Sequence, residues 1–196
     1  IPNGSNVSLS SGARLSVLQS AQVGADGAQT WTDVSGSTVE VAGGQTLSLR
    51  YNASRTFNCR FTGQGNLDLA VCAPGADTDA NKADFYNTSN DLSGTLTVRR
   101  GCLRLPAANV LPNLCTLNIL GPAVTNVGGC LDMNSLAEAV GVLTGDGRVG
   151  NSGTTVVQLS IGQNDGSGEF SGVIGASIGG TNGPAIRLGK AGIGVQ

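Results

Sequence analysis

The decapeptide "LTVRRGCLRL", residues 96–105, contains the pattern that decides the fold. Apolar and polar residues alternate on both sides of Gly101, which is the period of a β-strand with one buried face. Glycine supplies the positive φ that a sharp corner between two strands requires. The stretch therefore predicts two short strands joined by a corner.

The same pattern recurs along the chain, in "VSLSSGARLSV" (7–17), "VEVAGGQTLSL" (39–49) and "LNILGPAVTNVGGCLDM" (117–133). One such unit cannot bury its apolar face alone, but stacked copies form a continuous aliphatic core. We therefore predict an all-β solenoid. The best helical candidate, "DMNSLAEAVGVL" (132–143), is expected to form strand and turn as well.

The composition also favours strands and turns. Glycine accounts for 31 of 196 residues, and aromatic residues for 4%. Charged residues make up 12%, about half the usual share. No window collects the alanine, glutamate and lysine that helix bundles need.

Charge and residue content narrow the classes of function. The formal net charge is −2, with no basic cluster beyond Arg99 and Arg100, so no nucleic-acid footprint is visible. Apolar runs are only a few residues long, which predicts no transmembrane segment. Histidine, the commonest general base and metal ligand, is missing, and we expect a non-enzymatic protein without a cofactor. The chain opens at Ile1 without a signal-like segment, and we interpret it as a mature chain or a fragment.

The second half carries a more specific set of motifs. The stretches "AVGVLTGDGRVGNSGTT", "LSIGQNDGSGEFSGVIG" and "IRLGKAGIG" follow the order and spacing of the autotransporter-associated β-strand repeat. The chain resembles this family over roughly residues 94–196. The matching positions are Leu143, Gly145, Gly147, Phe170, Ser171, Gly172, Val173, Ile174, Lys190, Gly192 and Gly194.

The resemblance implies a right-handed parallel β-helix in a secreted or cell-surface bacterial protein, typically a passenger region of an adhesin-like protein. It implies no catalytic residues. Residues 94–196 are then a β-helix repeat module. Residues 1–93, which include an Asp-rich loop over 74–88, match the repeat loosely. For this first part a small β-rich cap is the alternative.

Five cysteines, Cys59, Cys72, Cys102, Cys115 and Cys130, lack the spacing of a zinc cluster. Cys102 and Cys130 occupy equivalent places in two repeat copies, and equivalent places in a solenoid stack about 4.8 Å apart, within reach of a disulfide. We predict a disulfide between them, or between Cys115 and one of them, and a local Cys59–Cys72 disulfide. The alternative is five small buried thiols. The remaining cysteine is available to bond a second chain.

Two acidic stretches contain oxygen ligands of the kind that calcium prefers. The first supplies Asp77, Asp79, Asn81 and Asp84, but it lacks the glycine and the final bidentate acid of a calcium loop. We therefore favour a solvated loop with no metal. The second, "NDGSGE" (164–169), is a strong turn signal and is expected to form a corner.

The sequence favours a structural or adhesive module whose partners are copies of itself, neighbouring repeats of a longer chain, or surface glycans. A polysaccharide-acting enzyme is the first alternative, and glycoside hydrolysis needs two carboxylates facing one cleft. Its candidates are Asp132, Asp146, Asp165 and Glu169, with Arg148 as an electrostatic partner. A carbohydrate- or ice-binding module with a flat Thr/Ser/Asn face is the second alternative.

Overall fold

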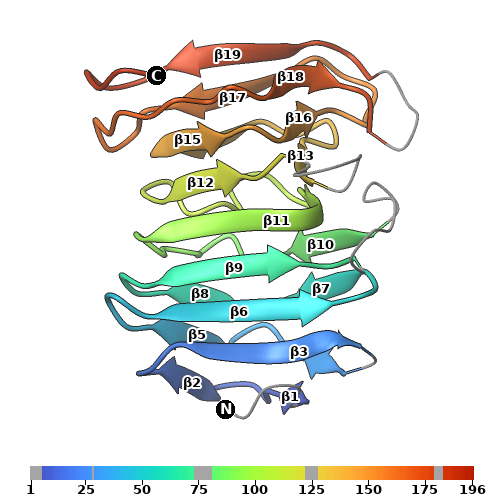
Figure 1. Ribbon diagram of the computed structural model, residues 1–196, viewed down its shortest axis with the longest axis vertical. Coiled ribbons are helices and arrows are strands. Elements are labelled where there is room, and N and C mark those ends of the chain that lie inside the picture. Colours follow the sequence, from blue (N-terminus) through green and yellow to red (C-terminus); the bar gives the residue numbers. More distant parts are fainter. Residues whose placement is uncertain (1–5, 28, 73–80, 122–127, 179–182) are drawn as a thin grey trace.

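The chain winds into a parallel β-solenoid (Figure 1). The computed structural model describes residues 6–27, 29–72, 81–121, 128–178 and 183–196. These residues form strands and turns and no helix. Every strand pairing among them is parallel. The predicted all-β solenoid is confirmed, including strand and turn in the segment 132–143.

The first side of the solenoid is a sheet that runs along most of its length. Each strand between β3 and β15 pairs with the strand one turn before it and the strand one turn after it. In order along the stack the strands are β3 (Ala21–Gly27), β6 (Thr46–Tyr51), β9 (Asn66–Ala70), the first half of β11 (Thr95–Arg104), β12 (Thr116–Ile119) and β15 (Val142–Gly145).

The second side is joined to the first through β11, which turns the corner at Gly101. Its strands are β7 (Arg55–Phe57), β10 (Lys82–Phe85), the second half of β11, β13 (Gly129–Asp132), β16 (Arg148–Gly150) and β18 (Val173–Ala176). Before these, β1 (Val7–Ser8) pairs with β4 (Trp31–Thr32).

The third side consists of two short sheets. The first contains β2 (Arg14–Val17), β5 (Thr38–Val41) and β8 (Arg60–Thr62), and the second contains β14 (Glu138–Val140), β17 (Val157–Ile161) and β19 (Ile186–Lys190). Two loops lie between these sheets. One lies against β8, where Asp91 N donates to Phe61 O, and the other lies against β14, where Val110 N donates to Glu138 Oε2.

The core consists of columns of apolar side chains stacked along the axis. Leu47, Leu67, Leu96, Leu117 and Leu143 are register partners on the first side and are buried. Full burial of each side chain contributes about 1.5–3 kcal/mol. The repeated Leu-x-apolar pattern of the sequence therefore places one leucine per turn in the same column.

Aromatic residues gather in the N-terminal part of the core. Phe57 makes edge contacts with Trp31, Phe61 and Phe85 at centroid distances of 5.6, 5.9 and 5.4 Å. The strands of residues 7–70 stack in the same way as the later ones, and β9 pairs directly with β11. The first side is therefore one continuous sheet across the boundary between residues 1–93 and the repeat module of residues 94–196.

The four sequence copies do not all lie at the same corner. The copies at 96–105 and 117–133 both join the first side to the second, and Cys102 pairs in register with Cys130. The copy at 7–17 instead joins β1 to β2, and the copy at 39–49 joins β5 to β6. These copies lie at three different corners and use the same apolar-polar alternation around a glycine, so the pattern alone does not distinguish the corners.

Candidate functional site

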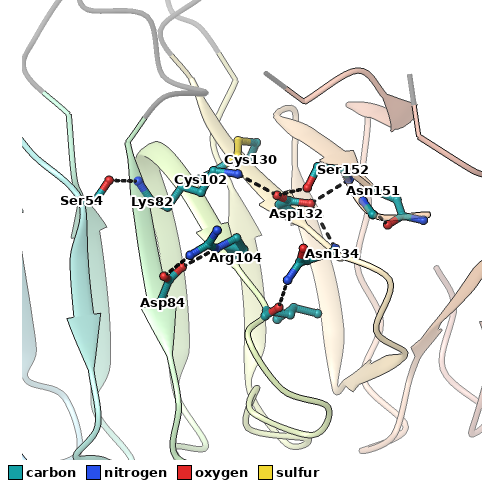
Figure 2. A network of polar contacts seen from close by, with 12 residues as sticks. Ser54, Lys82, Asp84, Cys102, Arg104, Cys130, Asp132, Asn134, Asn151 and Ser152 are labelled. Carbon is teal, nitrogen blue, oxygen red and sulfur yellow. Dashed lines mark hydrogen bonds and ion pairs between the residues drawn. A yellow bond between two sulfur atoms is a disulfide. The ribbon is translucent and has the colours of Figure 1, made fainter. Parts of the chain in front are cut away.

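The outer surface of the second side carries a ladder of charged residues. Asp84 on β10, Arg104 on β11 and Asp132 on β13 are register partners in three successive turns. Their side chains point outward, because the neighbouring Leu103 and Leu131 belong to the core. Acidic and basic residues therefore alternate along this row (Figure 2).

Asp132 is the most enclosed member of the ladder, with an exposed fraction of 0%. Its carboxylate accepts hydrogen bonds from Ser152 N at 3.0 Å, Ser152 Oγ at 2.7 Å and Asn134 N at 3.1 Å. The Nζ atom of Lys82 on β10 lies 3.1 Å from Asp132 Oδ2. These four contacts occupy the roughly four lone-pair sites of a carboxylate.

The environment of Asp132 stabilises its charged form. Burial alone would raise the pKa of this carboxyl, but the hydrogen bonds from Ser152 and the ammonium group of Lys82 outweigh burial, so the pKa lies below its ordinary value. A carboxylate held in this way is a poor proton donor or acceptor at neutral pH. The Asp132 cluster links β10 and β13 to the segment around Ser152 through hydrogen bonds and one ion pair.

Asp84 is occupied by a second ion pair. Arg104 Nε lies 2.9 Å from Asp84 Oδ1, and Arg104 Nη2 lies 2.5 Å from Oδ2. This two-pronged geometry is the strong form of an Arg–carboxylate pair. Of the other calcium candidates, Asn81 accepts a backbone bond from Cys102 N, while Asp77 and Asp79 lie outside the described residues. Among the described residues no acidic or cysteine cluster is arranged to hold a metal ion.

One disulfide lies beside the ladder, between Cys102 and Cys130 (Figure 2). Their Cα atoms are 4.5 Å apart, and Ile178 packs against both buried side chains. The predicted Cys102–Cys130 disulfide is confirmed. It joins two successive turns of the second side.

The other cysteine predictions are corrected by the structure. Cys59 and Cys115 are free thiols, so the Cys59–Cys72 disulfide and a disulfide of Cys115 are wrong. In a solenoid only residues a full turn apart stack, and Cys59 and Cys72 are less than a turn apart. Burial raises the pKa of Cys115 to about 12. Cys59, Cys72 and Cys115 are all buried, so none of them is placed to bond a second chain.

Within the part of the chain that the structure describes, the carboxylates proposed for an enzyme lie apart from one another and outside the described pockets. Asp146 follows β15 and accepts a hydrogen bond from Gly121 N at 2.5 Å. Asp165 lies at the corner after β17 and accepts from Ile193 N at 2.9 Å. Glu169 is exposed, whereas Asp132 is enclosed on the second side. Arg148 is the register partner of Cys130. The described pockets include none of these residues among their lining side chains.

The repeat-motif glycines lie where one turn closely approaches another. Gly145 ends β15 with φ +98°, and a Cβ atom there would lie 2.2 Å from the carbonyl oxygen of Ile119. Gly147 and Gly172 are similarly close to neighbouring turns. Gly192 has φ +62°, and its Cβ would lie 2.3 Å from Gly162 O. These positions require glycine for steric reasons.

The other motif residues lie at the C-terminal end of the solenoid. Phe170 forms a single parallel bridge with Gly145, and Ile174 pairs with Val149. Lys190 ends β19 and donates from Nζ to Gly192 O at 3.0 Å. The corner expected at "NDGSGE" is present between β17 and Phe170.

This end of the solenoid is hollowed and apolar. A cavity of about 570 Å³ opens there, lined mainly by Leu143, Ile161, Phe170, Ile174, Leu188 and Val195. Among the described residues, β18 pairs only with β16, and β19 pairs only with β17. Leu188 is 54% exposed and Ile193 is 90% exposed. The end therefore combines an open apolar core with two strand edges whose backbone groups lack a partner strand.

Sequence reasoning missed several residues of these networks. Lys82, Arg104 and Ser152 hold the two buried carboxylates, and Glu138 accepts bonds from the backbone of the preceding loop. The signal for the ladder becomes visible when "KADF" (82–85) is aligned with "CLRL" (102–105) and "CLDM" (130–133). That alignment gives Asp, Arg and Asp at one position.

Together the fold and these networks define the chain as a parallel β-solenoid whose second side carries ion pairs and a buried disulfide that join successive turns. Comparison with protein-family models, curated proteins and solved structures found no match. None of the described residues forms a helix with the length and hydropathy needed to cross a membrane.

Proposed function

We propose that the protein is a non-enzymatic structural or adhesive β-helix module that assembles end to end. The observation that carries this proposal is the open C-terminal end, with its apolar hollow beside β18 and β19. Unpaired strand edges are templates for another chain. A second copy stacked on this end would bury the hollow and pair both strands.

The N-terminal end supplies a matching surface. Among the described residues β1, β2 and β3 each pair on one side only. All pairings among the described strands are parallel, so the N-terminal edge of one copy presents strands in the direction that the next turn requires. Such head-to-tail contacts are heterologous and generate filaments.

The paired charges on the flanks support a scaffold role. Asp68 lies 2.7 Å from Arg50 and 3.0 Å from Arg99, and the second side carries the ladder of Asp84, Arg104 and Asp132. Ion pairs of this kind fix side chains between turns without offering free charges. The flanks therefore contribute rigidity, and among the described residues the C-terminal end carries the unpaired edges of β18 and β19.

We also propose an extracellular or cell-surface bacterial location. The disulfide supports it, because disulfides persist in oxidising compartments. The resemblance to the autotransporter-associated repeat supports it as well, since that family consists of secreted or displayed passenger regions. In this setting the partners are copies of the same chain or neighbouring repeats.

The test compares the wild-type chain with Leu188→Lys, which places a charge in the apolar end. The wild-type chain should sediment with a mass that increases with concentration and form rods in electron micrographs, whereas the variant should sediment as a monomer. Leu114→Lys is the matched control, because Leu114 is 54% exposed on the flank. Wild-type monomers at every concentration, or equal effects of both variants, would contradict end-to-end assembly.

A further inference from the structure

The third side contains a polar groove that end-to-end assembly does not use. It opens between the two sheets of this side, where residues 86–94 and 105–115 form loops instead of strands. Its volume is about 250 Å³. The lining residues that matter here are Thr88, Asp91, Asn109, Leu111, Asn113 and Leu114.

The walls of the groove are held by two buried polar side chains. Asn90 Oδ1 accepts from Phe61 N at 2.7 Å, and Asn90 Nδ2 donates to Asn87 O at 2.7 Å and to Val110 O at 2.8 Å. Glu138 Oε2 accepts from Val110 N at 2.8 Å. Because these bonds tie each loop to its neighbours, the groove is pre-organised, which lowers the cost of binding.

Three lining groups are available for a ligand. The side-chain amides of Asn109 and Asn113 and the hydroxyl of Thr88 form no bond with any described residue. An amide offers two donor hydrogens and an acceptor oxygen, and a hydroxyl offers both functions. Such groups match the hydroxyls of a sugar, each of which also donates and accepts.

The remaining lining residues favour an uncharged ligand. Asp91 forms an ion pair with Arg60, so its carboxylate is already neutralised. The exposed Leu114 supplies apolar surface, against which the C–H face of a sugar ring packs, and Leu111 lies buried beneath the groove. A few polar groups on an apolar background are typical of a small-molecule site.

We propose that this groove binds a neutral oligosaccharide, one ring of which lies between Asn109 and Asn113. The groove is smaller than the roughly 300–1,000 Å³ of a drug-sized pocket, so it holds part of a longer glycan. The inference deepens the adhesive part of the proposed function and rests on it. It names neutral glycans as the ligand class, and the groove lies on a different surface from the assembling ends.

The test measures binding of neutral tetrasaccharides built from glucose, mannose or N-acetylglucosamine to the wild-type chain by titration calorimetry. At least one should bind, and Asn113→Ala or Thr88→Ala should weaken its affinity about three- to tenfold, which is the effect of losing a hydrogen bond. Asn118→Ala, on the first side, is the matched control and should leave the affinity unchanged. Circular dichroism checks that each variant folds.

Several outcomes would overturn the proposal. They are the absence of binding by all three neutral sugars, binding of tetragalacturonate alone, and an equal loss in Asn118→Ala. The assembly state of each variant is measured by sedimentation in parallel. Asn113→Ala should assemble like the wild type, and Leu188→Lys should retain sugar binding, so failure of the groove and failure of end-to-end assembly are distinguishable.

Discussion

The Nζ atom of Lys82 lies 3.1 Å from Oδ2 of Asp132, although the two residues are 50 positions apart in the chain. The pair connects β10 to β13 across the intervening strand β11. Lys82 keeps part of its side chain in solvent, with an exposed fraction of 22%, whereas Asp132 is fully enclosed. Three successive turns are therefore held together by one ion pair.

Asp132→Asn should lower the free energy of unfolding by about 3 kcal/mol, because it removes one partner of a buried pair and leaves the ammonium group of Lys82 without its counter-charge. Urea unfolding followed by circular dichroism measures this change. Glu169→Gln is the control, since Glu169 is exposed, and should change the stability by less than about 0.5 kcal/mol. Equal effects of the two substitutions would show that the Asp132 network is not stabilising.

Cys102→Ser combined with Cys130→Ser should destabilise the chain by about 3.5 kcal/mol, since the disulfide closes a loop between residues 28 positions apart. Reductant should destabilise the wild-type chain by a similar amount and leave the double variant unchanged. The measurement is the midpoint of urea unfolding with and without reductant. A further loss of stability when the double variant is reduced would mean that a disulfide other than Cys102–Cys130 contributes.

Asp132 and Glu138 should make stability depend on pH in opposite directions. The folded pKa of Asp132 is lowered from 3.8, so its stabilisation is complete above that pH and is lost as the pH falls through the folded value. Burial raises the folded pKa of Glu138 from 4.5, although backbone hydrogen bonds oppose the shift. The folded state therefore binds more protons there, and the free energy of unfolding falls as the pH rises from 4.5 through the folded pKa.

Glu138→Gln isolates the second effect. The variant should lack the decline in the free energy of unfolding that Glu138 causes in the wild-type chain, because glutamine does not titrate. Unfolding curves recorded between pH 4.5 and neutral pH give the slope of the free energy of unfolding against pH for the wild-type chain and for the variant. Parallel profiles for the two proteins would contradict the raised pKa.

Leu96→Ala should lower the free energy of unfolding by about 3 kcal/mol, because it opens a cavity in the middle of the leucine column. Leu96 is fully buried between Leu67 and Leu117. Val173→Ala is the control, since Val173 is 57% exposed on β18. Urea unfolding gives both values, and a loss below about 1 kcal/mol for Leu96→Ala would argue against a closely packed column.

The local alternation of apolar and polar residues around glycine was enough to predict the solenoid and the Cys102–Cys130 disulfide. Gly101-Cys102-Leu103 and Gly129-Cys130-Leu131 have the same alternation after the same glycine, and they are register partners in the structure. The pattern failed for Cys59 and Cys72, because sequence proximity does not place two residues in one row of a solenoid. Only a separation of one full turn does so.

The ion pairs and the groove depend on register, which local pattern does not determine. Turns differ in length, so the sequence alone does not show that Asp84 lies opposite Arg104. The groove depends on two loops that interrupt the strands of the third side, and on Glu138, which the motif around it marks only as part of an apolar segment. Predicting the ion pairs and the groove would have required knowing how the turns stack on one another.

The disulfide also affects how the protein responds to pulling forces. A solenoid stretched from its ends extends by separating one turn from the next. The covalent bond between Cys102 and Cys130 keeps the chain between them from extending, which shortens the maximum reach of the chain by roughly 90 Å. Under tension this stretch would then stay closed after the turns outside it had opened, and reduction of the bond would release that length.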